Sequence, residues 1–432
     1  MNHIEKLLQT LAPKGVEFRK LGDIILSLKT GLNPRKFFKL NTPNANNYYV
    51  TVRELEEYTI KFTHQTDRID DDALSLCLKR SNLEKDDILF SGTGTIGKVS
   101  IIKENPNNWA IKEGIYSIKP NKKIVFPRFL MFCFENLNIQ NDIKSKSFGG
   151  IVKSISMNDL QQIQIPIPPL EVQQEIVKIL DAFTELNTEL NTELKARKKQ
   201  YQYYQNMLLD FNDINQNHKD AKMSAKTYPK RLKTLLQTLA PKGVEFRKLG
   251  EVLEYDQPNK YCVTSKEFDK SYPTPVLTAG KTFILGYTNE KDNIYQASKS
   301  SPVIIFDDFT TATQWVDFPF KVKSSAMKIL LPKNPTINIR FIFFYMQTIP
   351  YNISGEHTRQ WISRYSQITI PIPPLEIQQE IVKILDQFSA LTTDLLAGIP
   401  AEIEARKKQY EYYREKLLTF KPLTPQKEVK KC

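Results

Sequence analysis

The most regular apolar pattern in the chain runs over residues 170–211, where apolar positions recur mostly in steps of three and four. This spacing predicts one amphipathic helix of coiled-coil character, roughly 60 Å long at ~1.5 Å per residue. A related pattern covers 375–420, where Gly398 and Pro400 should break or kink the helix. The apolar seam of the first helix comprises Val172, Ile176, Ile179, Phe183, Leu186, Leu190, Leu194, Tyr201, Tyr204 and Leu208.

Shorter apolar runs of a different kind lie before each of these helices. Residues 86–102 and 301–316 combine β-prone runs with turn residues, which predicts strands joined by tight turns. The runs at 127–137 and 339–349 are mostly apolar, which is typical of short buried helices. We therefore expect an α+β domain in each half of the chain.

Three blocks of sequence occur twice. They are LLQTLAPKGVEFRKLG at 7–22 and 235–250, IPIPPLExQQEIVKILDxF at 165–183 and 370–388, and ARKKQYxYY at 196–204 and 405–413. The stretches between the blocks, 23–164 and 251–369, show no comparable identity. A duplicated enzyme is expected to keep its chemical residues in both inserts. Unlike inserts in a repeated frame instead favour a protein that reads two different targets.

This internal repeat divides the chain into six parts. Two spacer helices of one chain, each following a separate domain, can pair antiparallel and hold the two domains at opposite ends. The predicted parts are a first domain at 1–169, a spacer helix at 170–211, a polar linker at 212–234, a second domain at 235–374, a second spacer helix at 375–420 and a tail at 421–432.

The first spacer helix contains an almost threefold repeat of the unit TELN, marked by Thr184, Glu185, Leu186, Leu190 and Leu194. One such unit advances a helix by about 6 Å and rotates it by about 40° beyond a full turn. A unit can therefore be gained or lost without moving the apolar seam to the opposite face. If this helix runs roughly parallel to DNA, one unit changes the distance between the domains by about one to two base pairs.

The overall charge favours a polyanionic partner. The chain carries 61 Lys and Arg against 48 Asp and Glu, a formal charge of +13. The cysteines at 77, 133, 262 and 432 are scattered, so they indicate neither a disulfide framework nor a zinc site. No apolar run approaches the length of a membrane span, and we expect a cytoplasmic protein.

The strongest apparent enzyme motif is the glycine-rich stretch at 92–99, which fits the dinucleotide and kinase glycine patterns. The residues after Gly97 predict a strand, whereas a dinucleotide site needs a helix there to hold phosphate. A methyltransferase motif and a GxxxxGK[ST] helicase motif are also missing, and the four histidines are isolated. We therefore expect neither a catalytic residue nor a metal site.

The repeated blocks and the short tandem repeat together resemble the specificity subunits of type I restriction-modification systems, over nearly the whole chain. The resemblance implies two mixed α/β target-recognition domains, each reading one half of a split, asymmetric DNA site, separated by helices that the family conserves. It also implies that these helices bind two methyltransferase subunits, which methylate adenine, and that motor-nuclease restriction subunits join for cleavage. S-adenosylmethionine, ATP and Mg²⁺ are then expected on the partner subunits, and no cofactor on this chain.

Polar and basic loops are the expected DNA contacts, because base edges require donors and acceptors while cations near phosphates fix the register. In the first domain the candidates are Lys29, Thr30, Asn33, Arg35, Ser91, Thr93, Thr95, Lys98, Lys144, Lys146 and Lys153. In the second domain they are Gln257, Asn259, Lys260, Lys281, Thr310, Thr311, Gln314, His357, Arg359, Gln360 and Arg364.

Three other functions stay open at this point. The chain could be the targeting subunit of a fused nuclease-methyltransferase system, which the identity of the co-purifying polypeptide would show. A structural coiled-coil adaptor would be indifferent to DNA sequence. An autonomous nucleic-acid enzyme would show turnover without partners.

Overall fold

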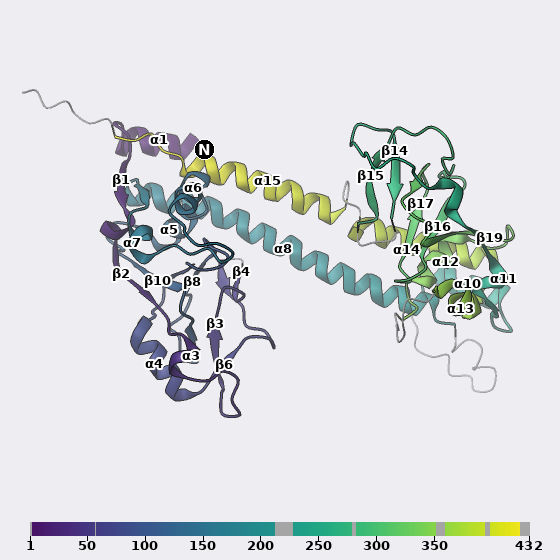
Figure 1. Ribbon diagram of the computed structural model, residues 1–432, viewed down its shortest axis with the longest axis horizontal. Helices are drawn as coiled ribbons and strands as arrows, with labels where there is room; N and C mark the ends of the chain where they lie inside the picture. Colours follow the sequence, from purple (N-terminus) through teal and green to yellow (C-terminus); the bar gives the residue numbers. More distant parts are fainter. Residues whose placement is uncertain are drawn as a thin grey trace, which may run out of the picture. The chain divides into compact units, whose positions relative to one another are not determined.

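The computed structural model describes residues 2–56, 58–211, 228–278, 282–350, 359–393 and 398–423. The chain divides into two compact units. Unit 1 comprises Met1–Leu190 and Ile403–Cys432, and unit 2 comprises Asn191–Glu402. Each unit therefore contains one predicted domain together with parts of both predicted spacer helices (Figure 1). In the described part of the chain, no helix has the length and apolar character needed to cross a lipid bilayer.

Unit 1 mixes short helices with strands from four sheets. Its helices are α1 (Asn2–Leu11), α2 (Leu21–Ile24), α3 (Pro34–Phe37), α4 (Asp71–Ser81), α5 (Pro127–Cys133), α6 (Leu137–Ser145), α7 (Met157–Gln161), the first part of α8 (Leu170–Leu209) and most of α15 (Ile399–Leu418). Its strands are β1 (Glu17–Lys20), β2 (Ile25–Thr30), β3 (Asn47–Val50), β4 (Leu55–Glu56), β5 (Thr59–Ile60), β6 (Arg68–Ile69), β7 (Ile88–Ser91), β8 (Val99–Ile101), β9 (Trp109–Ile111), β10 (Ile115–Pro120) and β11 (Gln164–Ile167).

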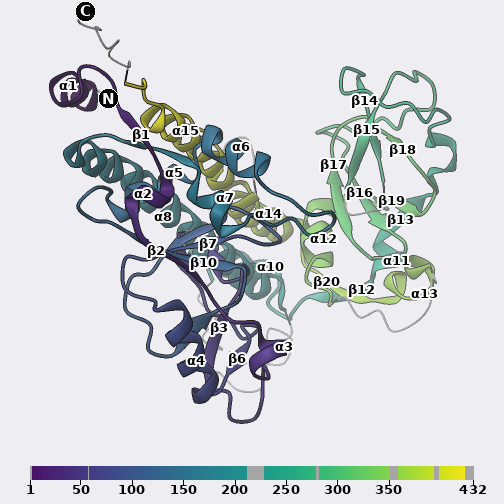
Figure 2. The same ribbon diagram turned by 60° about the vertical axis from the view of Figure 1, so that its left-hand side comes forward.

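Two sheets form the centre of the first insert. The larger has the order β2-β10-β7-β8 and is antiparallel throughout. The smaller has the order β6-β3-β9, in which β3 and β9 run parallel. Helix α4 lies beside the smaller sheet in both views of this unit (Figures 1 and 2).

Unit 2 contains the second insert and the rest of the spacer helices. Its helices are the second part of α8, α10 (Lys230–Leu239), α11 (Leu249–Val252), the 3₁₀ helix η1 (Pro258–Tyr261), α12 (Ile339–Met346), α13 (Gln360–Ser363), the 3₁₀ helix η2 (Tyr365–Gln367) and α14 (Leu375–Thr393). Its strands are β12 (Glu245–Lys248), β13 (Leu253–Asp256), β14 (Thr274–Leu277), β15 (Ile284–Thr288), β16 (Val303–Asp307), β17 (Thr313–Val316), β18 (Lys321–Val322), β19 (Met327–Pro332) and β20 (Thr369–Ile372).

The two inserts share one topology although their sequences differ. The main sheet of unit 2 has the order β13-β19-β16-β17, which matches β2-β10-β7-β8 strand for strand. The sheet β15-β14-β18 likewise has one antiparallel and one parallel pair, as β6-β3-β9 does. The sequence of unit 1 has α4 between β6 and β7. The corresponding residues of unit 2, 289–302, contain no helix. The expected fold class, two mixed α/β domains with long helices and an internal repeat, is confirmed.

The repeated blocks join each insert to its frame by the same contacts. Strand β1 pairs with β11, and β12 pairs with β20 in the equivalent register. The fully buried Gln173 donates to the carbonyl of Pro168 at 2.8 Å and accepts from the amide of Phe126. Gln378 does the same with Pro373 at 2.7 Å. These amides hold the start of each spacer helix against its own insert.

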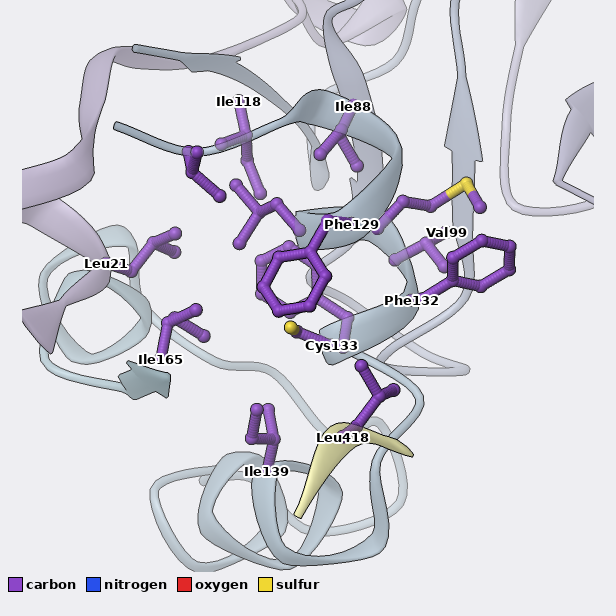
Figure 3. Packing of buried hydrophobic residues seen from close by; sticks show 14 of the residues in the cluster. Leu21, Ile88, Val99, Ile118, Phe129, Phe132, Cys133, Ile139, Ile165 and Leu418 are labelled. Atoms are coloured by element: carbon purple, nitrogen blue, oxygen red, sulfur yellow. The ribbon is translucent and has the colours of Figure 1, made fainter. Parts of the chain in front are cut away.

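Aromatic side chains of α5 form the centre of the core of unit 1. Phe129, Phe132 and Cys133 are inaccessible to solvent and lie among residues from the main sheet, the frame and the spacer helices (Figure 3). Helix α12 has the equivalent place in unit 2, with Phe341, Ile342 and Phe344 buried. The predicted buried helices at 127–137 and 339–349 and the strand pairs at 86–102 and 301–316 are confirmed.

The boundaries of the frame differ from the predicted ones in two places, the linker and the tail, and the predicted break of the second spacer helix near 398–400 is present. The predicted linker at 212–234 overlaps α10, which begins at Lys230, while 212–227 lie outside the described residues. The predicted second spacer helix is two helices, because α14 ends at Thr393 and α15 begins at Ile399 beside Pro400. The start of the predicted tail pairs with the frame, where Val16 donates to the carbonyl of Lys421 at 2.9 Å.

Candidate nucleic-acid interface

The glycine-rich hairpin between β7 and β8 carries three exposed polar side chains, Thr93, Thr95 and Lys98. Gly94 and Gly97 have φ of +80° and +91°, a region that glycine enters without strain, so the turn requires them. The motif continues into strand β8, and the phosphate-binding helix of a dinucleotide site does not follow it.

Ser91 faces inward at the base of this hairpin. Its hydroxyl donates to the carbonyl of Thr95 at 2.5 Å and accepts from the amide of Lys98 at 2.8 Å. Because both hydrogen bonds lie within the turn and the residue is buried, Ser91 holds the hairpin in shape. The residues left to meet a ligand are the three exposed ones.

A second loop, residues 144–153, is attached to the hairpin. The amide of Gly94 donates to the carbonyl of Lys153 at 2.8 Å, and Thr93 forms a bridge with Ser154. Lys144 and Lys153 are exposed, whereas Lys146 is half-buried with its ammonium 3.6 Å from the carboxylate of Asp142. Hairpin and loop therefore form one surface from two distant parts of the first insert.

The tip of this second loop carries exposed apolar side chains. Phe148, Ile151 and Val152 are all exposed, and Ile151 has no protein cover at all. An apolar tip flanked by lysines suits a nucleic acid, because it can contact thymine methyl groups or base faces while the cations meet phosphate. The sequence pattern singled out only the lysines here.

The end of β2 approaches the same surface through Gly114. The hydroxyl of Thr30 donates to the carbonyl of Ile115 at 3.1 Å and accepts from the amide of Gly114 at 3.1 Å. Gly114 in turn lies against Thr93, since a Cβ at Gly114 would be 2.9 Å from the hydroxyl oxygen of Thr93. The structure thus brings together three of the candidate segments in unit 1.

The remaining candidates of this segment differ in exposure. Asn33 caps α3 by accepting from the amide of Arg35 at 3.0 Å and donates to Glu113 at 2.9 Å. Lys29 is half-buried in β2, and Arg35 is exposed. Arg35 is therefore the best placed cation of this segment, while Asn33 stabilises the backbone that carries it.

In unit 2, Gln257 has a structural place. Its amide nitrogen donates to the carbonyl of Ser325 at 2.9 Å, and its amide oxygen accepts from the ammonium of Lys328. Lys328 is almost completely buried and also lies 3.6 Å from the carboxylate of Asp308. Gln257 therefore supplies a hydrogen-bond acceptor for the buried Lys328 ammonium. Its neighbours Asn259 and Lys260 are exposed.

The hairpin between β16 and β17 corresponds to the glycine-rich hairpin of unit 1. Thr310 donates to the carboxylate of Asp307 at 2.5 Å, Thr311 adopts φ of +62°, and Gln314 is exposed on β17. The buried Asp308 joins this hairpin to α13, because its carboxylate accepts from the amide of Trp361 at 2.8 Å.

The start of α13 supplies the other candidates of unit 2. Gln360 is buried, whereas Arg359 and Arg364 are exposed at the two ends of the helix. Lys281 and His357 lie outside the described residues. In both units, therefore, a hairpin of the main sheet is attached to the segment that precedes the last frame strand.

The TELN repeat lies within α8 and spans the boundary between the units. Leu190 is buried, Leu186 and Leu194 are half-buried, and Glu185 is exposed. Thr184 donates its hydroxyl to the carbonyl of Leu180 at 2.9 Å, one turn earlier. The repeat thus keeps its leucines on the packed face and its acidic residue in solvent, as the pattern predicts.

The frame also exposes apolar side chains that the sequence reasoning missed. Leu11 and Leu239 are 45% and 40% exposed, and Phe18 and Phe246 are 38% and 36% exposed. These residues occupy equivalent positions of the one block that repeats without change. The same apolar side chains are therefore partly exposed in both units.

The described residues offer neither a cluster of metal ligands nor an activated thiol. The residues that the structure describes contain no group of three or more His, Cys, Asp or Glu side chains arranged to hold a metal ion. Burial raises the pKa of the Cys133 thiol and raises the pKa of the Cys77 thiol to about 11, so neither is an activated nucleophile.

Comparisons with known proteins agree with this arrangement. The sequence model of the family described as "Type I restriction modification DNA specificity domain" matches residues 13–200 and 241–405. A type I restriction enzyme specificity subunit from Escherichia coli is 55% identical over 188 residues, which cover 41% of this chain and 45% of that protein, less than half of its length. A putative type I restriction enzyme specificity subunit from Haemophilus influenzae is 32% identical over 309 residues, or 68% of this chain and 72% of that one.

Two solved structures show the same fold. The S subunit of a type I restriction-modification system from M. genitalium superposes with a TM-score of 0.58 at 16% identity, covering 94% of this chain and 96% of that one. A chain from a study of complex assembly and conformational transition of a type I system gives 0.52 at 16% identity, covering 94% and 97%. At this identity the structures support the fold and nothing finer.

Proposed function

Because the chain belongs to the family of type I restriction-modification specificity proteins, we propose that it is the non-catalytic subunit that selects the DNA site for a partner adenine methyltransferase. Each unit reads one half of a bipartite, asymmetric site, and the spacer helices set the gap between the halves. Restriction subunits join the same complex to cleave unmodified DNA, and all of these components meet in the cytoplasm.

One observation carries this proposal: two inserts with unrelated sequences have the same sheet order. The shared topology places a hairpin and an attached segment at equivalent positions of each unit. The side chains presented there differ, with Thr93 and Lys98 in unit 1 against Thr310 and Gln314 in unit 2. Because base readout depends on donor and acceptor patterns, the same architecture with different side chains reads different sequences.

Phosphate contacts and base contacts divide between these residues. Lys98, Lys153 and Arg359 are exposed cations at the surfaces described above, and they suit phosphates. Threonine and glutamine side chains can both donate and accept, and they suit base edges in the major groove. In this arrangement the cations fix each unit on the duplex while the polar side chains select its half-site.

The repeated apolar positions support two partner subunits of one kind. Leu11 and Phe18 in unit 1 recur as the exposed Leu239 and Phe246 in unit 2. A surface used by one partner would have no need to repeat, whereas two copies of a methyltransferase would each meet the same side chains. These partners supply S-adenosylmethionine chemistry, and ATP and Mg²⁺ belong to the restriction subunits.

The test exchanges one insert in the assembled complex. Residues 23–164 are replaced by the corresponding insert of another family member, and the methylated sequences are read in cells that carry the partner subunits. The proposal predicts that one half-site changes while the other half-site and the gap stay the same. A change in both halves, or in neither, would contradict it.

The purified complex and the methylated sequences also distinguish this proposal from the adaptor and the fused nuclease-methyltransferase. A structural adaptor predicts methylation that does not depend on the insert. A fused nuclease-methyltransferase system predicts one co-purifying polypeptide that carries both activities, whereas the proposal predicts separate methyltransferase and restriction subunits.

A further inference from the structure

Each unit of the protein is completed by a helix segment from the opposite half of the chain. In unit 1 the segment is α15, which packs against the start of α8 and against α5 and α6 (Figure 1). In unit 2 the segment is the second part of α8, which packs against α14 and α12. We call α15 and the second part of α8 the closing segments.

The two closing segments are close copies of each other. Both contain the run ARKKQYxYY, in which Tyr201 and Tyr204 correspond to Tyr410 and Tyr413. Phe183 stacks on Tyr413 in unit 1, and its equivalent Phe388 stacks on Tyr204 in unit 2. The aromatic contacts therefore do not distinguish one closing segment from the other.

The aligned stretches 196–211 and 405–420 of the two segments differ at five positions, and the pair Gln205 and Arg414 is one of them. The repeated run aligns Arg414 of α15 with Gln205 of α8. The equivalent helices α5 and α12 align Glu135 with Gln347, since Arg128 and Arg340 at their starts form equivalent ion pairs with Asp181 and Asp386.

In unit 1 the Arg414 guanidinium lies 3.3 Å from the carboxylate of Glu135. In unit 2 the Gln205 amide lies 3.4 Å from the amide oxygen of Gln347 and 3.1 Å from the carbonyl of Phe344. The same place thus holds an ion pair in one unit and an amide pair in the other.

The ion pair lies in a network that is largely shielded from water. The hydroxyl of Tyr58 donates to Glu135 at 2.5 Å and lies 2.8 Å from the hydroxyl of Tyr410. The side chains of Arg414 and Glu135 are 15% and 24% exposed. Burial raises the pKa of the Glu135 carboxyl, and the hydrogen bond from Tyr58 together with the Arg414 guanidinium opposes this rise. Gln205 is buried and electrically neutral among neutral partners.

We propose that the Glu135–Arg414 and Gln205–Gln347 pairs make each unit accept its own closing segment and reject the equivalent segment of a second copy of this chain. With Gln205 in place of Arg414, the shielded Glu135 carboxylate loses its cation. With Arg414 in place of Gln205, a guanidinium faces two neutral oxygens. The first wrong pairing leaves a shielded carboxylate without its cation, which is more costly than losing a surface contact. In the second, Arg414 loses Glu135 and keeps only the carboxylate of Glu415 on its own helix, 3.0 Å away.

The excluded partner is a second copy for a geometric reason. Helix α8 is continuous from Leu170 to Leu209. Its second part cannot turn back onto the unit in which its first part lies, so a wrong pairing has to come from another chain. The device therefore favours the closed single chain over assemblies that exchange helices, and it does not depend on the proposed DNA function.

The test uses the full-length chain, co-expressed with two different affinity tags. The double variant E135Q/R414Q makes both units neutral, and Q205R/Q347E makes both units charged. Each variant removes the difference between the units at this pair of positions. Each should raise the fraction of one tag captured with the other by roughly tenfold, as expected for ~1.4 kcal/mol of lost selectivity. The variant with all four substitutions restores a difference in reversed form and should return to the native fraction.

The matched control is E404Q/K408Q, which removes an exposed ion pair of α15, 3.6 Å long, away from the contact. It should leave the captured fraction unchanged, and circular dichroism should show native helix content in every variant. Native-level capture by both double variants would overturn the proposal, as would equal capture by the fourfold variant and the doubles. If one double variant fails to fold, the captured fraction of the other still tests the proposal, because one makes both units neutral and the other makes both units charged.

Discussion

Phe183 of α8 stacks on Tyr413 of α15 with ring centroids 5.5 Å apart and planes inclined by 27°. The equivalent pair, Tyr204 and Phe388, stacks at 4.9 Å and 23°. In each pair the phenylalanine comes from the block that follows an insert, and the tyrosine comes from the end of the other spacer. The repeated frame therefore closes each unit through a contact between the two halves of the sequence.

Removal of one ring of this contact should loosen the unit that contains it. We expect Phe183→Ala to lower the free energy of unfolding by about 2 kcal/mol, less than for a fully buried ring because Phe183 is half-buried. Denaturant unfolding of the purified chain measures this change. Leu26→Ala is the matched control, since Leu26 is 65% exposed in the same unit, and it should change stability by less than about 0.5 kcal/mol. Equal effects of the two substitutions would show that the stack contributes nothing.

Much of this frame follows from sequence pattern, and the reasons for the remainder are physical. Leucines and tyrosines that recur every three or four residues predict α8, which runs from Leu170 to Leu209. The sequence pattern does not show which spacer segments pair, because Tyr204 and Tyr413 belong to the same repeated run ARKKQYxYY and both can stack on the equivalent phenylalanines. It also does not show that two inserts without shared identity have one sheet order.

The candidate site shows a similar division. Exposed Lys98 and Lys153 lie on one surface, as two basic loops of the sequence suggested separately. Ser91 and Gln257 make hydrogen bonds within their own units, because a polar residue of a loop can equally well satisfy buried backbone or a buried cation. The sequence gives no sign of this difference, since exposure depends on how the chain folds back.

The exposed lysines of unit 1 should contribute phosphate contacts. We expect the double variant K98A/K153A, in the assembled methyltransferase complex, to weaken binding to all sequences and to reduce the salt dependence of log Kd by about 2, roughly one per lost contact. Binding titrations at several salt concentrations measure the slope. Lys85→Ala is the control, because Lys85 is exposed beyond the opposite end of β7. An unchanged slope in the double variant would remove these lysines from the interface.

Gln257 should act on stability and not on sequence choice. Its substitution by alanine leaves the buried Lys328 ammonium with fewer acceptors, and we expect a loss of about 1–2 kcal/mol in the free energy of unfolding. The methylated sequence should be the same as for the native chain. A changed base preference at native stability would show instead that Gln257 reads DNA.

Acid should weaken unit 2 through Glu290. Burial acts to raise the pKa of its carboxyl, but hydrogen bonds from Lys321, Ser265 and Thr264 outweigh burial and lower the pKa to about 2. In the unfolded chain this pKa is about 4.3, so unfolding takes up a proton below that pH. The Glu290 carboxylate makes its full contribution to the free energy of unfolding above about pH 4.3, the pKa in the unfolded chain. This contribution, up to about 3 kcal/mol, is lost as the pH falls towards 2.

The substitution Glu290→Gln isolates this effect. The variant should be less stable than the native chain at pH 6, and the difference should shrink as the pH falls from 5 to 3. Thermal unfolding at a series of pH values measures it. A stability difference that stays constant over this range would contradict the account of Glu290.

The most direct test of the central claim, that two DNA-reading units are held apart by a helix that sets their spacing, is the methylated sequence in cells carrying this chain and its partners. The comparison is between the chain as it stands and a variant without one TELN unit at 184–187. The account predicts two unchanged half-sites with a gap shorter by about one or two base pairs, since one unit advances a helix by ~6 Å. An unchanged gap would contradict the spacing role, and changed half-sites would contradict the assignment of readout to the inserts.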